Sequence, residues 1–159
     1  MENIKLPLYD VVNKLFFGFL FILYLVYRFP CKLSLLQFKL FPDSILTGIW
    51  ISFIYFLGYC INRIGSIIVE FICKNTKIFY WGSFKKYCKV ANNKQVQIIN
   101  REYANSRTFC SLFLILIIIE LYNSYYNYIC YLIFFLCLFI ISARKHTKKM
   151  KTLINKGND

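Results

Sequence analysis

Basic side chains alternate with aromatic rings in the polar segment between residues 74 and 107. Basic side chains follow the phosphates of a single-stranded nucleic acid, and aromatic faces stack on its bases, each stacked base being worth about 1 to 3 kcal/mol. The pattern predicts a binding site for a single-stranded oligonucleotide or a nucleotide. The residues expected to form it are Arg63, Trp81, Lys85, Lys86, Tyr87, Lys89, Arg101 and Arg107. An interfacial helix on anionic lipid has a similar composition, and residues 79–84 taken alone favour that alternative.

Glu120 is the one charged residue between Thr108 and Ala143. A carboxylate inside a membrane-spanning helix costs about 2.5 to 3.5 kcal/mol on insertion scales, so it is expected to face protein or water. Glu120 is therefore a candidate pore-lining residue. The alternative, in which its carboxylate reaches the lipid headgroups near Tyr122, stays open.

The other reactive side chains are scattered along the chain. The seven cysteines form no C-x-x-C pair, whereas a zinc site needs closely spaced ligands. The spacing of Arg144 and the single histidine, His146, does not fit an arginine–histidine ribonuclease motif. The six glycines form neither a phosphate-binding loop nor a nucleophile elbow. We expect no enzymatic activity, no metal site and no cofactor.

The elements that carry these residues are predicted from the separation of charged and apolar blocks. Residues 108–143 would form a single helix about 54 Å long, which exceeds the ~30 Å hydrocarbon core of a bilayer. The chain must therefore fold back, and the polar residues 122–127 offer the only break. This predicts two spans, 108–122 and 125–143, followed by a basic tail, 144–159.

Two further spans are predicted at 11–29 and 45–61. A cleaved signal peptide is the alternative for the first, but Arg28-Phe29-Pro30-Cys31 offers no small-residue cleavage site. Helical periodicity continues beyond the second span through Cys73, so this helix is expected to project into the cytoplasm. The chain is thus predicted to be a single all-α membrane domain, 1–159, with four transmembrane helices and a helical cytoplasmic region, 62–107.

The distribution of lysine and arginine predicts the orientation. With both termini in the cytoplasm, 17 of the 20 basic residues lie inside, and only Arg28, Lys32 and Lys39 lie outside. The positive-inside rule selects this arrangement. The net charge of +13 also agrees with an anionic partner, whether nucleic acid, lipid or protein.

Small residues recur along the second helix, with Gly48 four residues from Ser52 and Gly58 seven from Gly65. Small residues allow helices to approach closely in lipid, so one face is expected to form a helix–helix seam. Whether that seam lies within or between subunits stays open. Four spans enclose little water, so conduction would require several copies around an axis.

Residues 8–15, which lead into the Gly18 span, and residues 58–70 resemble small four-span membrane proteins of bacterial antiviral defence loci. The best candidates are the membrane effectors of the Hailong system, and the four-span component of the Kiwa system is second. The first resemblance implies a homo-oligomeric channel, with a tetramer favoured. A single-stranded DNA oligomer from a companion nucleotidyltransferase would hold it shut, and phage infection would open it to depolarise the host in abortive infection.

The alternative function is a non-conducting membrane scaffold or sensor that recruits a cytoplasmic defence protein, as a Kiwa-like partner would imply. A lipid-handling or holin-like membrane disruptor is a third possibility.

Overall fold

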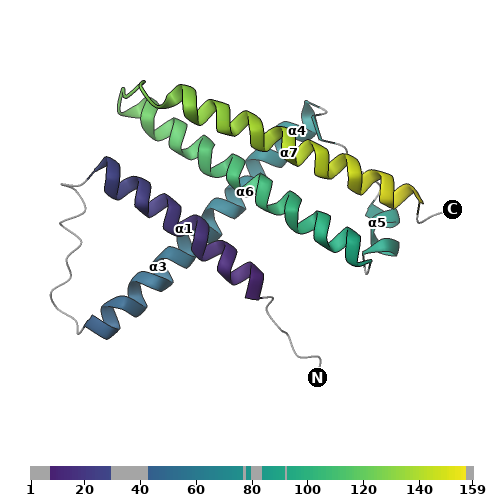
Figure 1. The fold of residues 1–159 in the computed structure, drawn as a ribbon, viewed down its shortest axis with the longest axis horizontal. Coiled ribbons are helices and arrows are strands. Elements are labelled where there is room, and N and C mark those ends of the chain that lie inside the picture. Colours follow the sequence, from purple (N-terminus) through teal and green to yellow (C-terminus); the bar gives the residue numbers. More distant parts are fainter. Residues whose placement is uncertain (1–7, 30–42, 77, 80–83, 92, 157–159) are drawn as a thin grey trace. The chain divides into compact units, whose positions relative to one another are not determined.

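The computed structural model describes residues 8–29, 43–76, 78–79, 84–91 and 93–156. These residues form helices and turns, with no strand among them. In chain order the helices are α1 (Leu8–Arg28), α3 (Asp43–Ile64), the π-helical η2 (Gly65–Val69), α4 (Glu70–Asn75), α5 (Phe84–Val90), α6 (Lys94–Tyr122) and α7 (Ile129–Lys156) (Figure 1). The all-α fold class is confirmed.

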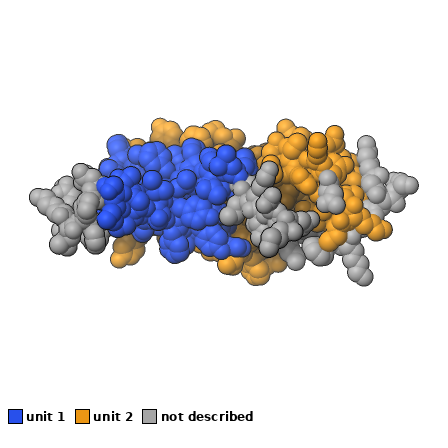
Figure 2. Space-filling model, turned by 90° about the horizontal axis from the view of Figure 1, so that it is seen from below, with its two compact units in different colours: residues 1–63 blue, residues 64–159 orange. Residues whose placement is uncertain are grey.

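Four helical stretches are long and apolar enough to cross a membrane. They cover Leu8–Arg28, Ser44–Cys73, Lys94–Tyr122 and Ile129–Asn155. Each overlaps one of the four spans expected from the sequence, which supports a multi-pass membrane protein. The chain divides into two compact units, unit 1 (residues 1–63, blue in Figure 2) and unit 2 (residues 64–159, orange).

The helices of unit 1, α1 and α3, cross with their backbones in direct contact. A Cβ atom on Gly18 would lie 1.8 Å from the carbonyl oxygen of Ile54, and one on Gly58 would lie 1.7 Å from the carbonyl oxygen of Lys14. Only glycine allows so close an approach. Gly58 therefore belongs to the expected seam, and its partner is α1 of the same chain. Gly48, expected in the same seam, would have no neighbouring atom within 4 Å of its Cβ.

The second apolar helix continues from Asp43 to Asn75 through α3, η2 and α4. Its helical extension past the expected span is confirmed, but the π-helical segment η2 was not predicted. A Cβ on Gly65, the first residue of η2, would lie 3.1 Å from Ser111 Oγ on α6. Gly65 therefore lets η2 pack closely against α6, and in this position too the small residue meets a helix of its own chain.

Helices α6 and α7 form the antiparallel hairpin of unit 2 (Figure 1). Aromatic rings stack between them: the ring centroid of Phe139 lies 4.2 Å from that of Phe109 and 5.7 Å from that of Phe113. The buried core of unit 2 includes Val69, Cys73, Phe79, Tyr103, Cys110 and Ala143. Side chains from η2, α4, α6 and α7 thus share one core.

The turn of the hairpin is placed later than expected. The fourth span was predicted to begin at residue 125, but α7 begins at Ile129. The side-chain amide nitrogen of Asn123 donates to the Ile119 carbonyl at 2.7 Å, and the backbone N–H of Tyr125 donates to the Glu120 carbonyl at 3.0 Å. Ser124 takes a left-handed conformation, with φ of 58°. These contacts hold the residues after α6 against its last turn, which delays the start of α7.

Both hairpin helices extend beyond the expected spans at their other ends. α6 begins at Lys94, where the Asn93 side chain caps it by accepting a hydrogen bond from the Gln95 backbone N–H at 2.8 Å. α7 continues to Lys156. Lysine, arginine and glutamine favour helix, and no proline or glycine interrupts either extension. The end of the expected helical region 62–107 and most of the basic tail are therefore continuous with the two spans.

Candidate functional site

Positive charge is concentrated where α6 and α7 lie side by side away from the hairpin turn. We refer to residues 94–107 of α6 and 144–156 of α7 as the basic hairpin end. It holds nine basic residues and one acidic residue, Glu102. The exposed cations are Lys94, Arg101, Arg144, Lys145, Lys148, Lys149 and Lys151. Packing of the two helices places charges that are far apart in the sequence on one structural element.

The short helix α5 packs against α7 and adds to this charge. It carries four of the expected ligand-binding residues, of which Lys89 is exposed and Tyr87 is half-buried. Lys85 and Lys86 are part of α5, but their side chains lie outside the described structure. Trp81 lies outside the described residues altogether. Both α5 and Arg101 belong to unit 2.

A shallow groove of about 390 Å³ lies between α6 and α7 in the basic hairpin end. Its floor is apolar and its edge is polar. Gln95, Ile98 and Ile99 line it from α6, and Lys149, Thr152 and Leu153 line it from α7. This groove was not predicted from the sequence, although apolar residues at 98–99 and 153–154 stand out within charged segments. The groove suits a ligand with both apolar and anionic groups.

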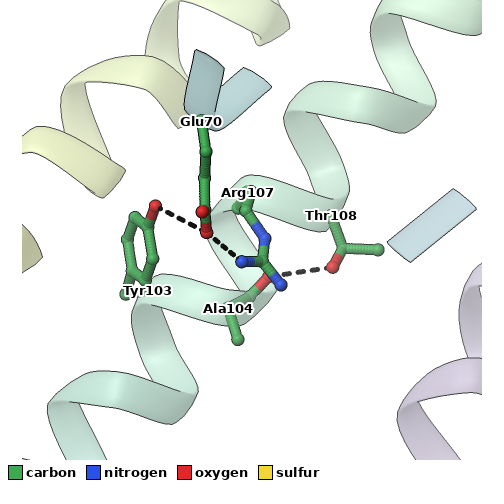
Figure 3. A network of polar contacts seen from close by, with 5 residues as sticks. All are labelled: Glu70, Tyr103, Ala104, Arg107 and Thr108. Carbon is green, nitrogen blue, oxygen red and sulfur yellow. Dashed lines mark hydrogen bonds and ion pairs between the residues drawn. The ribbon is translucent and has the colours of Figure 1, made fainter. Parts of the chain in front are cut away.

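Arg107 is held inside unit 2 by an ion pair (Figure 3). Its guanidinium donates to the Glu70 carboxylate, and the Tyr103 hydroxyl donates to the same oxygen at 3.2 Å. The Arg107 and Glu70 side chains are only 15% and 26% exposed. Because its charge is matched by Glu70, Arg107 is a weaker candidate for binding an external anion than Arg101. Sequence spacing gave no indication of this pair.

Arg63, the remaining basic residue of the predicted site, is the last residue of unit 1. Its side chain is exposed and lies over the Tyr59 ring, with its guanidinium carbon 5.0 Å from the ring centroid. Arg63 belongs to unit 1, whereas the cations on α5, α6 and α7 belong to unit 2.

A carboxylate, an imidazole and two hydroxyls form a row between α6 and α7. Glu102 Oε2 lies 3.1 Å from His146 Nδ1, and His146 Nε2 lies 3.3 Å from Ser142 Oγ. Ser142 Oγ in turn lies 3.1 Å from Ser106 Oγ. The order of groups is that of an acid–histidine–serine triad, but acyl transfer also needs N–H donors for an oxyanion. These four residues lie inside helices, where backbone N–H groups bond along the helix, so we interpret the row as a polar bridge.

Glu120, the pore candidate, lies at the turn end of α6 and is only 1% exposed within the single chain. The structure therefore places its side chain against protein, as expected for a carboxylate in a span. Elsewhere, the described residues contain no group of three or more His, Cys, Asp or Glu side chains placed to hold a metal ion.

Comparison with protein-family models, with curated proteins and with solved structures gives no match to this chain. Function must therefore be inferred from the residues and their arrangement.

Proposed function

We propose that the chain is an inner-membrane effector of anti-phage defence, which forms a homo-oligomeric channel held shut by a polyanion on its basic hairpin end. The observation that carries the proposal is the excess of positive charge on that element, which holds nine basic residues and a single acid, with Glu70 of α4 pairing one of the nine, Arg107. A folded helical pair with so much exposed like charge repels itself unless an anion binds. A single-stranded DNA oligomer is the favoured ligand, because the resemblance to Hailong-type effectors implies one.

The arrangement of the cations supports binding to a chain of phosphates. Arg144, Lys148 and Lys151 are exposed and follow the i, i+4, i+7 spacing that places residues on one helix face. Lys89 on α5 and Arg101 on α6 are exposed within the same unit. A single-stranded oligonucleotide can follow such a row with successive phosphates, whereas a mononucleotide would contact only part of it.

Channel activity is the second part of the proposal. The described helices of one chain form a hairpin and a crossed pair, and four spans enclose little water. Conduction therefore requires several copies around an axis, with the termini and the basic hairpin end in the cytoplasm by the positive-inside rule. Release of the polyanion would open the channel and dissipate the membrane potential.

The groove in the basic hairpin end favours a second function. Its apolar floor, formed largely by Ile98, Ile99 and Leu153, suits the side chains of an acidic protein segment better than a phosphate backbone. A non-conducting scaffold that recruits a cytoplasmic defence protein would use this groove and the surrounding lysines.

Expression without a companion gene separates the two functions. A channel without its inhibitor should depolarise cells and stop growth, measured with a potential-sensitive dye alongside the amount of inserted, oligomeric protein. In liposomes the purified protein should release a trapped ion, and a short single-stranded oligonucleotide should reduce that release. If well-inserted oligomers leave the membrane potential and the liposome content unchanged, the scaffold is the better account.

A further inference from the structure

In unit 1, two cations converge on a pair of tyrosine rings beside the crossing of α1 and α3. The Lys14 ammonium nitrogen lies 5.6 Å from the centroid of the Tyr55 ring and 5.5 Å from that of the Tyr59 ring. The Arg63 guanidinium carbon lies 5.0 Å from the Tyr59 centroid, and its Nε donates to the Tyr59 hydroxyl at 2.9 Å. Lys14 and Arg63 thus contact one and the same ring from two different helices.

The tight helix crossing fixes this arrangement. Lys14 is one turn from Gly18 on α1, and Tyr59 follows Gly58 on α3. Because the Gly58 backbone touches the Lys14 carbonyl, the Lys14 side chain is carried directly to the α3 tyrosines. Backbone packing of α1 against α3 therefore places the Lys14 side chain beside the tyrosine rings.

The two charges are not matched by an acidic side chain among the residues that the structure describes. Among the described residues, neither Lys14 nor Arg63 forms an ion pair with a carboxylate, and Asp10, one turn earlier on α1, bonds to neither. Aromatic faces attract a cation by about 0.5 to 2 kcal/mol but leave its charge in place. Two cations around one ring leave a local excess of positive charge, which attracts an anion.

The position along the helices identifies the anion. Lys14 lies in the first turn of the expected span 11–29, and Arg63 lies just beyond the expected span 45–61, so both lie near one membrane interface. Phospholipid phosphates are found at that depth, and basic pockets between spans at the cytoplasmic interface bind anionic headgroups. We propose that Lys14, Tyr55, Tyr59 and Arg63 bind the phosphate of an anionic phospholipid. This inference is independent of the proposed channel function, and it assigns Arg63 to lipid and not to a nucleic acid.

Lipid retention measured by native mass spectrometry tests the site in the full-length chain. The protein is released from nanodiscs that contain phosphatidylglycerol and phosphatidylcholine, and the bound lipids are counted. Arg63→Gln should weaken phosphatidylglycerol binding roughly tenfold, as expected for loss of one charge-assisted contact, and Lys14→Gln/Arg63→Gln should weaken it further. Phosphatidylcholine binding should change less. Tyr59→Phe keeps the ring but removes the hydroxyl that orients Arg63, so its effect should be smaller than that of Arg63→Gln.

The matched control is Arg28→Gln, which removes the same charge at the opposite end of α1. It should leave phosphatidylglycerol retention within about twofold of the unmodified chain, a change worth less than one hydrogen bond. Equal losses in Arg28→Gln and Arg63→Gln would overturn the proposal, because attraction would then depend on overall charge alone. Retention unchanged in Arg63→Gln would overturn it as well, and since that side chain is exposed, the variant is expected to fold normally.

Two competitors distinguish the possible sources of phosphate. Inorganic phosphate that binds lipid-free protein, and does so less in Arg63→Gln, would support the phosphate site with a soluble ligand as its occupant. Failure of inorganic phosphate to displace phosphatidylglycerol supports the lipid. Displacement of the lipid by a short single-stranded oligonucleotide would overturn the assignment and return Arg63 to the polyanion site.

Discussion

At the scale of single residues, the Glu70–Arg107 ion pair can be broken by one substitution. Glu70→Gln would leave the Arg107 guanidinium, which is only 15% exposed, without its carboxylate. Loss of a partner for a largely buried polar group costs about 1 to 3 kcal/mol, so the free energy of unfolding should fall by that amount. Tyr103→Phe removes only the weaker bond to the same carboxylate and should cost about 1 kcal/mol. Denaturant titration in mixed micelles, followed by circular dichroism, measures both.

A double-mutant cycle is the control for this pair. The Glu70→Gln/Arg107→Gln variant should be less destabilised than the two single changes added together, because neither charge is then left unmatched. Lys148→Gln, which removes an exposed charge on α7, should change stability by less than about 0.5 kcal/mol. Additive losses in the cycle would show that the two side chains contribute separately.

The sequence offered little guidance at this scale. The pattern of charges predicted the same ligand-binding role for Arg101 and Arg107, because both lie in the expected helical region 62–107. Tertiary packing distinguishes them: η2 and α4 approach α6 and bring Glu70 to Arg107, while Arg101 stays exposed. Likewise, the packing of α6 against α7 brings together four polar residues that lie far apart in the sequence: Glu102, Ser106, Ser142 and His146.

At the scale of elements, the glycine crossing of α1 and α3 gives a prediction with an internal control. Gly58→Ala would place a methyl group 1.7 Å from the Lys14 carbonyl oxygen, so the helices must separate. Overpacking of this kind costs about 1 to 3 kcal/mol, and backbone cannot move aside as a side chain can. Fluorescence of Trp50 on α3, in a Trp81→Phe background, should report loss of the pairing at lower denaturant concentration.

Gly48→Ala is the matched change on the same helix. A methyl group at Gly48 would have no neighbour within 4 Å, and alanine favours helix over glycine by up to about 1 kcal/mol. Its stability should therefore be equal to or greater than that of the unmodified chain. A loss at Gly48 as large as that at Gly58 would mean that Gly48 packs against another copy of the chain.

Helices were the part of the fold most accessible from sequence. Long uncharged runs predicted four spans, and helical periodicity predicted continuation of the second helix through Cys73, which the structure confirms. Periodicity could not predict the π-helical η2 or the late start of α7 at Ile129. Both depend on how one helix packs or bonds against another: Gly65 on Ser111, and the turn residues on the end of α6.

At the scale of the whole molecule, the charge distribution predicts which cations should bind a polyanion. Sequence alone located the positive charge in residues 74–107 and 144–159, but not the groove or the neutralisation of Arg107 by Glu70. The structure therefore shows that Lys89 and Arg101 are exposed, whereas the Arg107 side chain is only 15% exposed and pairs with Glu70.

Salt dependence of oligonucleotide binding tests that division. Each cation that contacts a phosphate releases a counterion, so Arg101→Gln should reduce the slope of log affinity against log salt by about 0.7 for a single strand. Arg107→Gln should reduce it much less, because Glu70 already balances that charge. Fluorescence anisotropy of a labelled oligothymidine across a salt series measures the slope. Arg28→Gln, at the C-terminal end of α1, serves as the control. Equal slopes for Arg101→Gln and the control would remove Arg101 from the interface. Binding that is absent at low salt would leave the groove, and with it a protein partner, as the better explanation for the basic hairpin end.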